Sequence, residues 1–247
     1  MSFDGIFLHK LMKEFNILKT GRITKIMESG DTDFVLTIRV NHQNYTLMLG
    51  LSSDYARIHF TTKSYDFPET PKSLTMLLRK HIEGYFIEDI YQYQNDRIVV
   101  FSLNGYSEMK DFTHKYLICE IMGRYSNLIL TDESFCILEV LKHAGVTEFG
   151  RTMLPHAIYQ FPISTKKNPY TLSLNEFLEL SISSPKELCQ TFEGVSISLA
   201  NYVFTQAKPL KTFHELIHQE SMPTLYQTST GKKDFYFFPL EETILQK

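Results

Sequence analysis

The stretch FVLTIRVNHQNYTLMLGL, residues 34–51, decides the fold class of this 247-residue chain. Phe34, Leu36, Ile38 and Val40 recur at every second position, which is the period of a strand with one buried face. The polar letters NHQN then predict a turn, and YTLMLGL reads as a second strand. Two strands joined by a short polar turn predict an antiparallel hairpin, and therefore a sheet at the centre of the fold.

Strand patterns continue on both sides of this hairpin. GRITKIM precedes it, and the later runs are ARIHFTT, FIEDIYQY, RIVVFSL, KYLICEIM, NLILT and FCILEVLKH. Two segments have helical spacing: residues 4–15, which precede the strands, and residues 71–84, which interrupt them. Asp4 is placed as an N-cap of the first, and the second opens with proline and closes with glycine. We therefore predict an α+β domain with a mainly antiparallel sheet over residues 1–168.

A polar break, STKKNPYT, ends this region, and the pattern then becomes helical. LNEFLELS, PKELCQTF, SISLANYVFTQA and LKTFHELIHQ predict a helical subdomain over residues 169–220. Residues 221–247 contain two strand-like runs around the turn GKK, and we expect this hairpin to return to the sheet of the first domain.

Composition narrows the function classes. The formal net charge is −3, so no overall positive field recruits nucleic acid, and such a partner requires a local patch. Three cysteines in apolar contexts indicate free thiols in a reducing compartment. The first apolar segment carries charged residues, which argues against a signal peptide or membrane span. We expect a cytoplasmic protein without a membrane partner, and display at the cell surface would need a signal-less route.

The letters HELIH, residues 214–218, match the zinc-peptidase pattern H-E-x-x-H. A third ligand is required, and the downstream acids are Glu220, Glu241 and Glu242. Glu220 is too close to reach the same metal, and the other two follow a stretch that reads as strand. We therefore expect no metal, no cofactor and no catalytic residue, and keep the zinc peptidase as an alternative for metal analysis.

Four clusters have the chemistry to hold phosphates and base edges. An arginine fork grips phosphate with two hydrogen bonds, and a neighbouring carboxylate can orient it. Taken singly, each cluster is more typical of a solvated turn or face than of a binding site. The clusters are the pair Asp96–Arg97; Arg22 and Lys25; Arg79 and Lys80; and Glu120, Arg124, Ser126 and Asn127.

Eight ordered blocks across the chain resemble the N-terminal region of the NFACT proteins. The blocks are MSFDGIFLHKL, GRITKI, LTIRV, YARIHFTT, MLLRKHIEG, NDRIVVF, EIMGRYSNLIL and LKHAG…R…LP. Bacterial members of that family are ribosome quality-control factors that have also been described as fibronectin-binding proteins. The resemblance implies a fold similar to the N-terminal domain of formamidopyrimidine-DNA glycosylases, followed by a helix-hairpin-helix-like subdomain that EGVSISLANYV begins.

The resemblance also implies a function. Family members bind the large ribosomal subunit that carries an obstructed peptidyl-tRNA, recruit tRNA and promote C-terminal alanine tailing, while the ribosome forms the peptide bonds. Glycosylase chemistry is not implied, because those enzymes use an N-terminal Pro-Glu pair and this chain begins Met-Ser-Phe-Asp. The second hypothesis is a surface adhesin that binds host fibronectin.

The resemblance assigns roles residue by residue. The tRNA-handling pair of the family falls on Asp96 and Arg97, its N-terminal acidic residue on Asp4, and its E-I-M-G-R/K block on Glu120, Met122, Gly123 and Arg124. Arg22, Lys25, Arg79 and Lys80 are then candidates for phosphate contact. His156 and Ala157 depart from the family pattern, in which a glycine usually follows the proline. Family chains continue into a coiled coil and a C-terminal RNA-binding domain, so we expect this sequence to be part of a longer chain.

Overall fold

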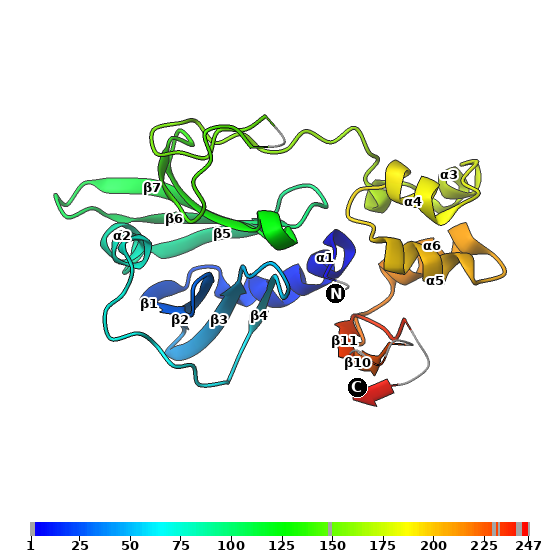
Figure 1. Cartoon of the computed structure of the whole chain (residues 1–247), viewed down its shortest axis with the longest axis horizontal. Helices are drawn as coiled ribbons and strands as arrows, with labels where there is room; N and C mark the ends of the chain where they lie inside the picture. Colours follow the sequence, from blue (N-terminus) through cyan, green and yellow to red (C-terminus); the bar gives the residue numbers. More distant parts are fainter. Residues whose placement is uncertain (1–2, 148–149, 229–230, 232, 241–243, 247) are drawn as a thin grey trace. The chain divides into compact units, whose positions relative to one another are not determined.

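The computed structural model describes residues 3–147, 150–228, 231, 233–240 and 244–246. In this part of the chain the protein has an α+β fold dominated by antiparallel strands, as predicted (Figure 1). One sheet has nine strands in the order β4-β3-β2-β1-β5-β6-β7-β8-β9, and a second has three in the order β11-β10-β12.

The large sheet is built from short, mostly sequential strands. They are β1 (Arg22–Ser29), β2 (Asp33–Val40), β3 (Gln43–Gly50), β4 (Arg57–Phe60), β5 (Phe86–Gln92), β6 (Ile98–Tyr106), β7 (Phe112–Glu120), β8 (Asn127–Asp132) and β9 (Ile137–Val140). Helix α1 (Gly5–Phe15) and the short helix η1 (Asn16–Leu18) precede the sheet, and α2 (Ser73–Ile82) lies between β4 and β5 in sequence.

The hairpin that decided the fold class forms as predicted. Val40 pairs with Gln43, and the two turn residues between them, Asn41 and His42, have φ of 46° and 68°. Two positive φ values at consecutive turn positions are typical of the primed turns that match strand twist. The alternating Phe34, Leu36 and Ile38 of β2 are buried, as the spacing predicted.

The chain forms two compact units, and each is discontinuous in sequence. The sheet unit comprises Met12–Tyr93 and Ile98–Pro162, and the helical unit comprises Met1–Leu11, Gln94–Arg97 and Ile163–Lys247. This division differs from the predicted boundaries at residues 168 and 220. Ile6 N donates to Gly194 O at 3.2 Å, an example of the long-range contacts that join the N-terminal segment to the helical unit.

The helical unit contains the four predicted helices. They are α3 (Leu174–Leu178), α4 (Pro185–Thr191), α5 (Ile197–Phe204) and α6 (Pro209–His218), preceded by the short helix η3 (Pro169–Thr171). Serine side chains cap the first three helices through backbone N–H groups, as polar N-caps do. The fourth helix, α6, is capped at its C-terminal end by Lys10. The buried Nζ of Lys10 donates to the carbonyl oxygens of Ile217 and Gln219.

The C-terminal hairpin corrects one expectation. β10 (Thr224–Gln227) pairs with β11 (Lys233–Tyr236) as predicted, but its other edge pairs with β12 (Ile244–Gln246). Both edges of β10 are therefore occupied, and these strands form a sheet of their own instead of returning to the large sheet. No helix in the described ranges is long and apolar enough to cross a membrane.

Candidate functional site

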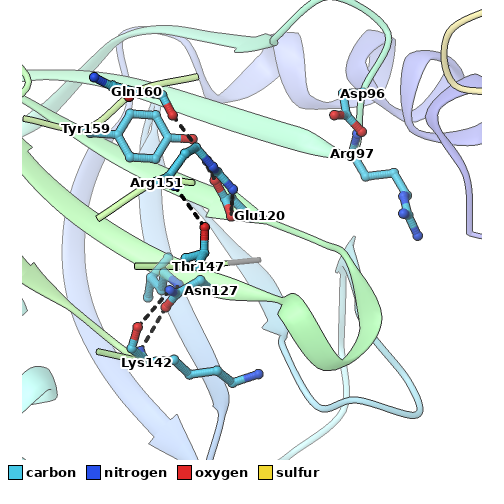
Figure 2. Close-up of polar contacts among 10 residues, drawn as sticks. Asp96, Arg97, Glu120, Asn127, Lys142, Thr147, Arg151, Tyr159 and Gln160 are labelled. Carbon is cyan, nitrogen blue, oxygen red and sulfur yellow. Dashed lines mark hydrogen bonds and ion pairs between the residues drawn. The ribbon is translucent and has the colours of Figure 1, made fainter. Parts of the chain in front are cut away.

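The pair Asp96–Arg97 lies on the turn between β5 and β6, in the part of that turn that belongs to the helical unit. Asp96 Oδ1 accepts a hydrogen bond from the backbone N–H of Arg97 at 2.7 Å. The guanidinium of Arg97 makes no hydrogen bond or ion pair within the described residues, and its side chain extends away from the Asp96 carboxylate (Figure 2). An arginine fork without a partner on a fixed turn is available to an external anion.

Two glycines hold this turn in place. The carbonyl oxygen of Asn95 lies so close to Gly5 and Gly194 that an added Cβ would be 1.8 Å and 2.4 Å from it, respectively. The Asn95 side chain is buried and donates to Glu193 at 3.3 Å. The start of α1 and the turn between α4 and α5 therefore fix the residue that precedes Asp96.

Asp4 is buried at 5% exposure beside the same glycines. It is the N-cap of α1, because its Oδ1 accepts from Phe7 N at 2.9 Å, as predicted. Its Oδ2 accepts from Ser196 N at 3.3 Å and from the Tyr236 hydroxyl at 2.7 Å. Burial raises the pKa of the Asp4 carboxyl, although these hydrogen bonds act in the opposite direction. The hydrogen bonds of Asp4 thus connect the start of α1 with the start of α5 and with β11.

Glu120 ends β7 in the sheet unit and is 2% exposed. Its carboxylate receives two hydrogen bonds from the Arg151 fork, at 2.6 Å and 3.2 Å, and one from the Tyr159 hydroxyl at 2.8 Å (Figure 2). Burial would lower the pKa of Arg151, but the bonds to Glu120 and its charge raise it overall. Burial next to Glu120 also raises the pKa of Tyr159.

A cavity of about 120 Å³ adjoins this cluster. Glu120 on β7 lies opposite Asn127 on β8 in the strand register. The Asn127 side chain accepts a hydrogen bond from Lys142 N at 2.9 Å and donates one to Lys142 O at 3.1 Å. Burial lowers the pKa of Lys142, whose Nζ donates to the Arg124 carbonyl at 3.2 Å. A single buried water needs about 10–15 Å³ of such space, so the cavity has room for several waters or a group of phosphate size. Its lining is Glu120, Arg124, Tyr125, Asn127, Lys142, His143, Ala144, Thr147, Arg151 and Met153.

Two other residues of the E-I-M-G-R block differ in their exposure: Arg124 is exposed and Met122 is half-buried. The Arg124 guanidinium carbon is 4.5 Å from the centroid of the Tyr125 ring. Met122 packs against the buried cluster that includes Ile98 and Val140, so its side chain supports the sheet. Within the sheet unit the structure therefore brings Glu120 and Arg124 to one cavity.

The four predicted phosphate contacts fall in different surroundings. Lys25 and Arg79 line a second cavity of about 320 Å³, and Arg79 Nε donates to Ile26 O at 2.8 Å. Arg22 is exposed on β1, and Lys80 is 3.6 Å from Glu108. Lys25 and Arg79 therefore share a cavity, and acidic Glu69 and Glu83 line it with them.

The histidines of HELIH lie on α6. His218 Nδ1 is 2.8 Å from the His214 carbonyl oxygen, so this nitrogen interacts with the backbone. Burial, first, and then the charge of His218 lower the pKa of His214. No group of three potential metal ligands occurs among the described residues, and Glu241 and Glu242 lie outside them.

Sequence reasoning missed Arg151, Lys142 and Tyr159. Arg151 lies 31 residues from Glu120, so no local spacing links the two side chains. The available signal was the arginine in the last of the eight resembling blocks, LKHAG…R…LP.

Comparison with known proteins completes the description of the site. A family model described as "NFACT N-terminal and middle domains" matches residues 4–246. "Rqc2 homolog RqcH" of Streptococcus suis is 40% identical over 95% of this chain and 44% of its own length. The protein of the same name from Bacillus subtilis is 37% identical over 97% of this chain and 45% of its own length. The chain thus spans less than half the length of these relatives.

Two solved structures are similar over almost the whole chain. The N-terminal part of the fibronectin/fibrinogen-binding protein from Streptococcus suis has a TM-score of 0.85 and 36% identity. The fibrinogen-binding protein from Staphylococcus aureus has a TM-score of 0.86 and 31% identity. Each match covers 98% of this chain and 92% of the solved chain.

Proposed function

This chain belongs to the NFACT family, and from that membership we propose that it is the tRNA- and large-subunit-binding module of a bacterial ribosome quality-control factor. Relatives named Rqc2 homolog RqcH support a role in ribosome quality control. In this proposal the module works in the cytoplasm and helps to add C-terminal alanine to stalled nascent chains. The ribosome forms the peptide bonds, so the module is not itself an enzyme.

The observation that carries the tRNA assignment is the turn at Asp96–Arg97. The Arg97 guanidinium has no partner in the described part of the chain. The backbone of Asn95, which precedes the pair, is in close contact with Gly5 and Gly194. A cation on a rigid turn can bind a phosphate or a base edge with little loss of conformational freedom. Asp96 and Arg97 are therefore the proposed tRNA contacts. Asp4 is buried and would hold in place the segments that support their turn.

The cavity beside Glu120 is the proposed second contact. Arg124 lies at its surface and would bind a phosphate, while Glu120 is occupied by Arg151 and Tyr159 and would shape the cavity rather than touch RNA. Met122 would act through packing. Arg22, Lys25, Arg79 and Lys80 remain candidates for further phosphate contacts.

The helix pair around Gly194 supports a helix-hairpin-helix-like element. α4 and α5 flank a short connection that contains Gly194 with φ of 72°, a conformation that favours glycine. A chain that contains both a mainly antiparallel sheet and a group of short helices is compatible with the proposed likeness to formamidopyrimidine-DNA glycosylases in fold alone. Both proposed likenesses concern the fold, and neither carries glycosylase chemistry to this chain.

Binding of fluorescent tRNA to the chain across a salt series tests the proposal. Asp96→Ala/Arg97→Ala should weaken binding by about 5- to 150-fold, the range for loss of a specific arginine contact. Lys63→Ala/Asp66→Ala is the matched control, because it removes one exposed cation and one exposed anion elsewhere. In the full-length factor, the first variant should abolish alanine tailing. Intact tailing would refute the assignment of the pair.

The alternative function is binding of host fibronectin at the cell surface. It is favoured by the similarity to structures of fibronectin/fibrinogen-binding and fibrinogen-binding proteins. The purified chain would then bind immobilised fibronectin in a saturable manner that resists moderate salt. Absence of such binding would remove the adhesin hypothesis and leave the tRNA proposal untouched.

A further inference from the structure

A line of paired residues crosses six neighbouring strands of the large sheet, from β3 to β7. Directly paired residues of antiparallel strands point to the same face. All six side chains are exposed or half-exposed, and we call this line the arginine strip. Its members, in order across the sheet, are Asn44, Arg39, Arg22, Phe86, Asn104 and His114.

Two arginines are direct partners in this strip. Like charges placed opposite each other on paired strands destabilise a sheet unless an anion compensates them. Within the described ranges neither Arg22 nor Arg39 has a carboxylate partner, and Arg39 makes no hydrogen bond at all through its side chain. Glu88 on β5, which is not a member of the strip, lies 3.6 Å from His114 at the far end. The pair therefore presents uncompensated positive charge.

The Arg22 fork is fixed in position by its neighbours. Its Nε donates to the Gly84 carbonyl at 2.9 Å, and its guanidinium carbon is 6.0 Å from the centroid of Phe86. Gly84 has φ of 92°, and an added Cβ would be 3.3 Å from the terminal nitrogen of Arg22. A β-bulge between Ile23 and Lys25 also turns Lys25 onto the face of Arg22, where it pairs with Thr37.

Exposed rings continue the same face. Phe86 is 47% exposed, and the paired Tyr106 and Phe112 lie two positions beyond Asn104 and His114 on β6 and β7. Nucleobases stack on exposed aromatic rings of sheets, whatever the sequence. Arginine forks beside flat rings and amide side chains thus provide one group for each part of a nucleotide: phosphate, base face and base edge.

We propose that the arginine strip binds single-stranded RNA, with Arg22 and Arg39 on backbone phosphates and Phe86 against a base. The choice of RNA over another polyanion rests on the proposed function, while the positive charge and the exposed rings come from the sheet itself. The residues of the strip belong to the sheet unit, whereas Asp96 and Arg97 belong to the helical unit.

The test uses the whole 247-residue chain and a fluorescent oligouridylate of about ten nucleotides, within the site size of such surfaces. Arg22→Gln/Arg39→Gln should weaken binding at least about tenfold at low salt. It should also reduce the salt slope by about 1.4, because each single-strand phosphate contact contributes about 0.7. Lys13→Gln/Lys63→Gln changes net charge equally at exposed sites and should preserve binding.

Phe86→Leu separates stacking from charge. It should weaken binding of oligouridylate and leave binding of inorganic polyphosphate unchanged, since polyphosphate has no base. Equal loss in the lysine control, no loss in the arginine variant, or no binding by the wild-type chain would overturn the inference. Equal, arginine-dependent binding of a polyglutamate peptide would overturn the choice of RNA.

Failure of this inference and failure of the proposed function are distinguishable. Asp96→Ala/Arg97→Ala should leave oligouridylate binding intact and should weaken tRNA binding. Loss of tRNA binding in that variant, together with an unaffected arginine variant on oligouridylate, would retain the tRNA proposal and reject the strip. The reverse pattern would retain the strip as an RNA surface and reject the pair.

Discussion

Two side chains that are distant in sequence stabilise the Glu120 carboxylate: Arg151 compensates its charge, and the Tyr159 hydroxyl donates a hydrogen bond to it. Arg151→Met removes the fork and leaves a buried carboxylate without its cation. Loss of one partner of a buried ion pair costs about 3–5 kcal/mol, so we expect that decrease in the free energy of unfolding. Urea unfolding of the chain measures it.

Two further variants check the origin of this loss. Glu120→Gln in addition to Arg151→Met removes the orphaned charge and should recover part of the stability. Arg57→Met is a control at a half-exposed arginine that donates to the Tyr55 carbonyl, and should cost less than about 1 kcal/mol. Equal decreases in the free energy of unfolding for Arg151→Met and Arg57→Met would contradict the stabilising role of the buried Glu120–Arg151 pair.

The raised pKa of Asp4 predicts a pH dependence of stability. A buried carboxyl whose folded pKa exceeds the ordinary value of 3.8 favours the protonated form in the native state. The native state then binds more protons than the unfolded state between 3.8 and the raised pKa, so stability from this group falls as pH rises through that window. Asp4→Asn should remove this fall, which chemical denaturation at about pH 4 and about pH 7 measures. Identical pH profiles for the two proteins would contradict it.

At the residue scale the sequence predicts local roles better than distant partners. Asp4 was identified as an N-cap because its partner, Phe7 N, lies three residues away. Its bond to Tyr236 joins residues 232 positions apart, and no spacing rule reaches that far. The same limit explains why Glu120 was a candidate and Arg151 was not.

The start of α1 supports the Asp96–Arg97 turn through close backbone contact. Gly5→Ala would place a Cβ 1.8 Å from the Asn95 carbonyl oxygen, so the turn must move. Overpacking of this kind costs about 1–3 kcal/mol. We expect a lower thermal midpoint together with weaker tRNA binding, although the substitution leaves Asp96 and Arg97 themselves unchanged.

A matched glycine substitution isolates this effect. Gly145→Ala adds the same methyl group where nothing lies within 4 Å, and should alter neither the midpoint nor tRNA binding. If Gly5→Ala destabilised the chain and bound tRNA normally, the turn geometry would not be a determinant of binding. Both measurements use the same purified proteins.

At the element scale, the spacing of apolar residues was sufficient to predict most strands and helices. Phe34, Leu36 and Ile38 predicted β2, and the segment that opens with Pro71 contains α2. The bulges at Ile23/Lys25 and Ile87/Asp89 were not predicted, because a bulge changes which side chains share a face without changing apolar content. The first of these bulges places Lys25 on the same face of the sheet as the arginine strip.

At the scale of the whole molecule, the sequence predicted contiguous domains and the structure has discontinuous units. Met1–Leu11 and Gln94–Arg97 both belong to the helical unit, although strands of the sheet unit flank the second segment in sequence. Such membership results from long-range contacts, for example Ile6 N to Gly194 O and Asn95 Nδ2 to Glu193. Hydrophobic period carries no information about these pairings.

The net charge of −3 gives the last prediction, which concerns how an acidic chain binds RNA. At about 0.15 M salt the Debye length is about 8 Å, so distant acids are largely screened and RNA responds to local cations. Arg97→Ala should therefore weaken tRNA binding by about 5- to 150-fold. Adding Glu133→Gln and Glu179→Gln, two exposed acids, makes the variant less acidic than the wild type and should still not restore binding. Restored affinity in a tRNA titration would instead show that the overall field of the chain governs association, and Arg97 would lose its assignment as a contact.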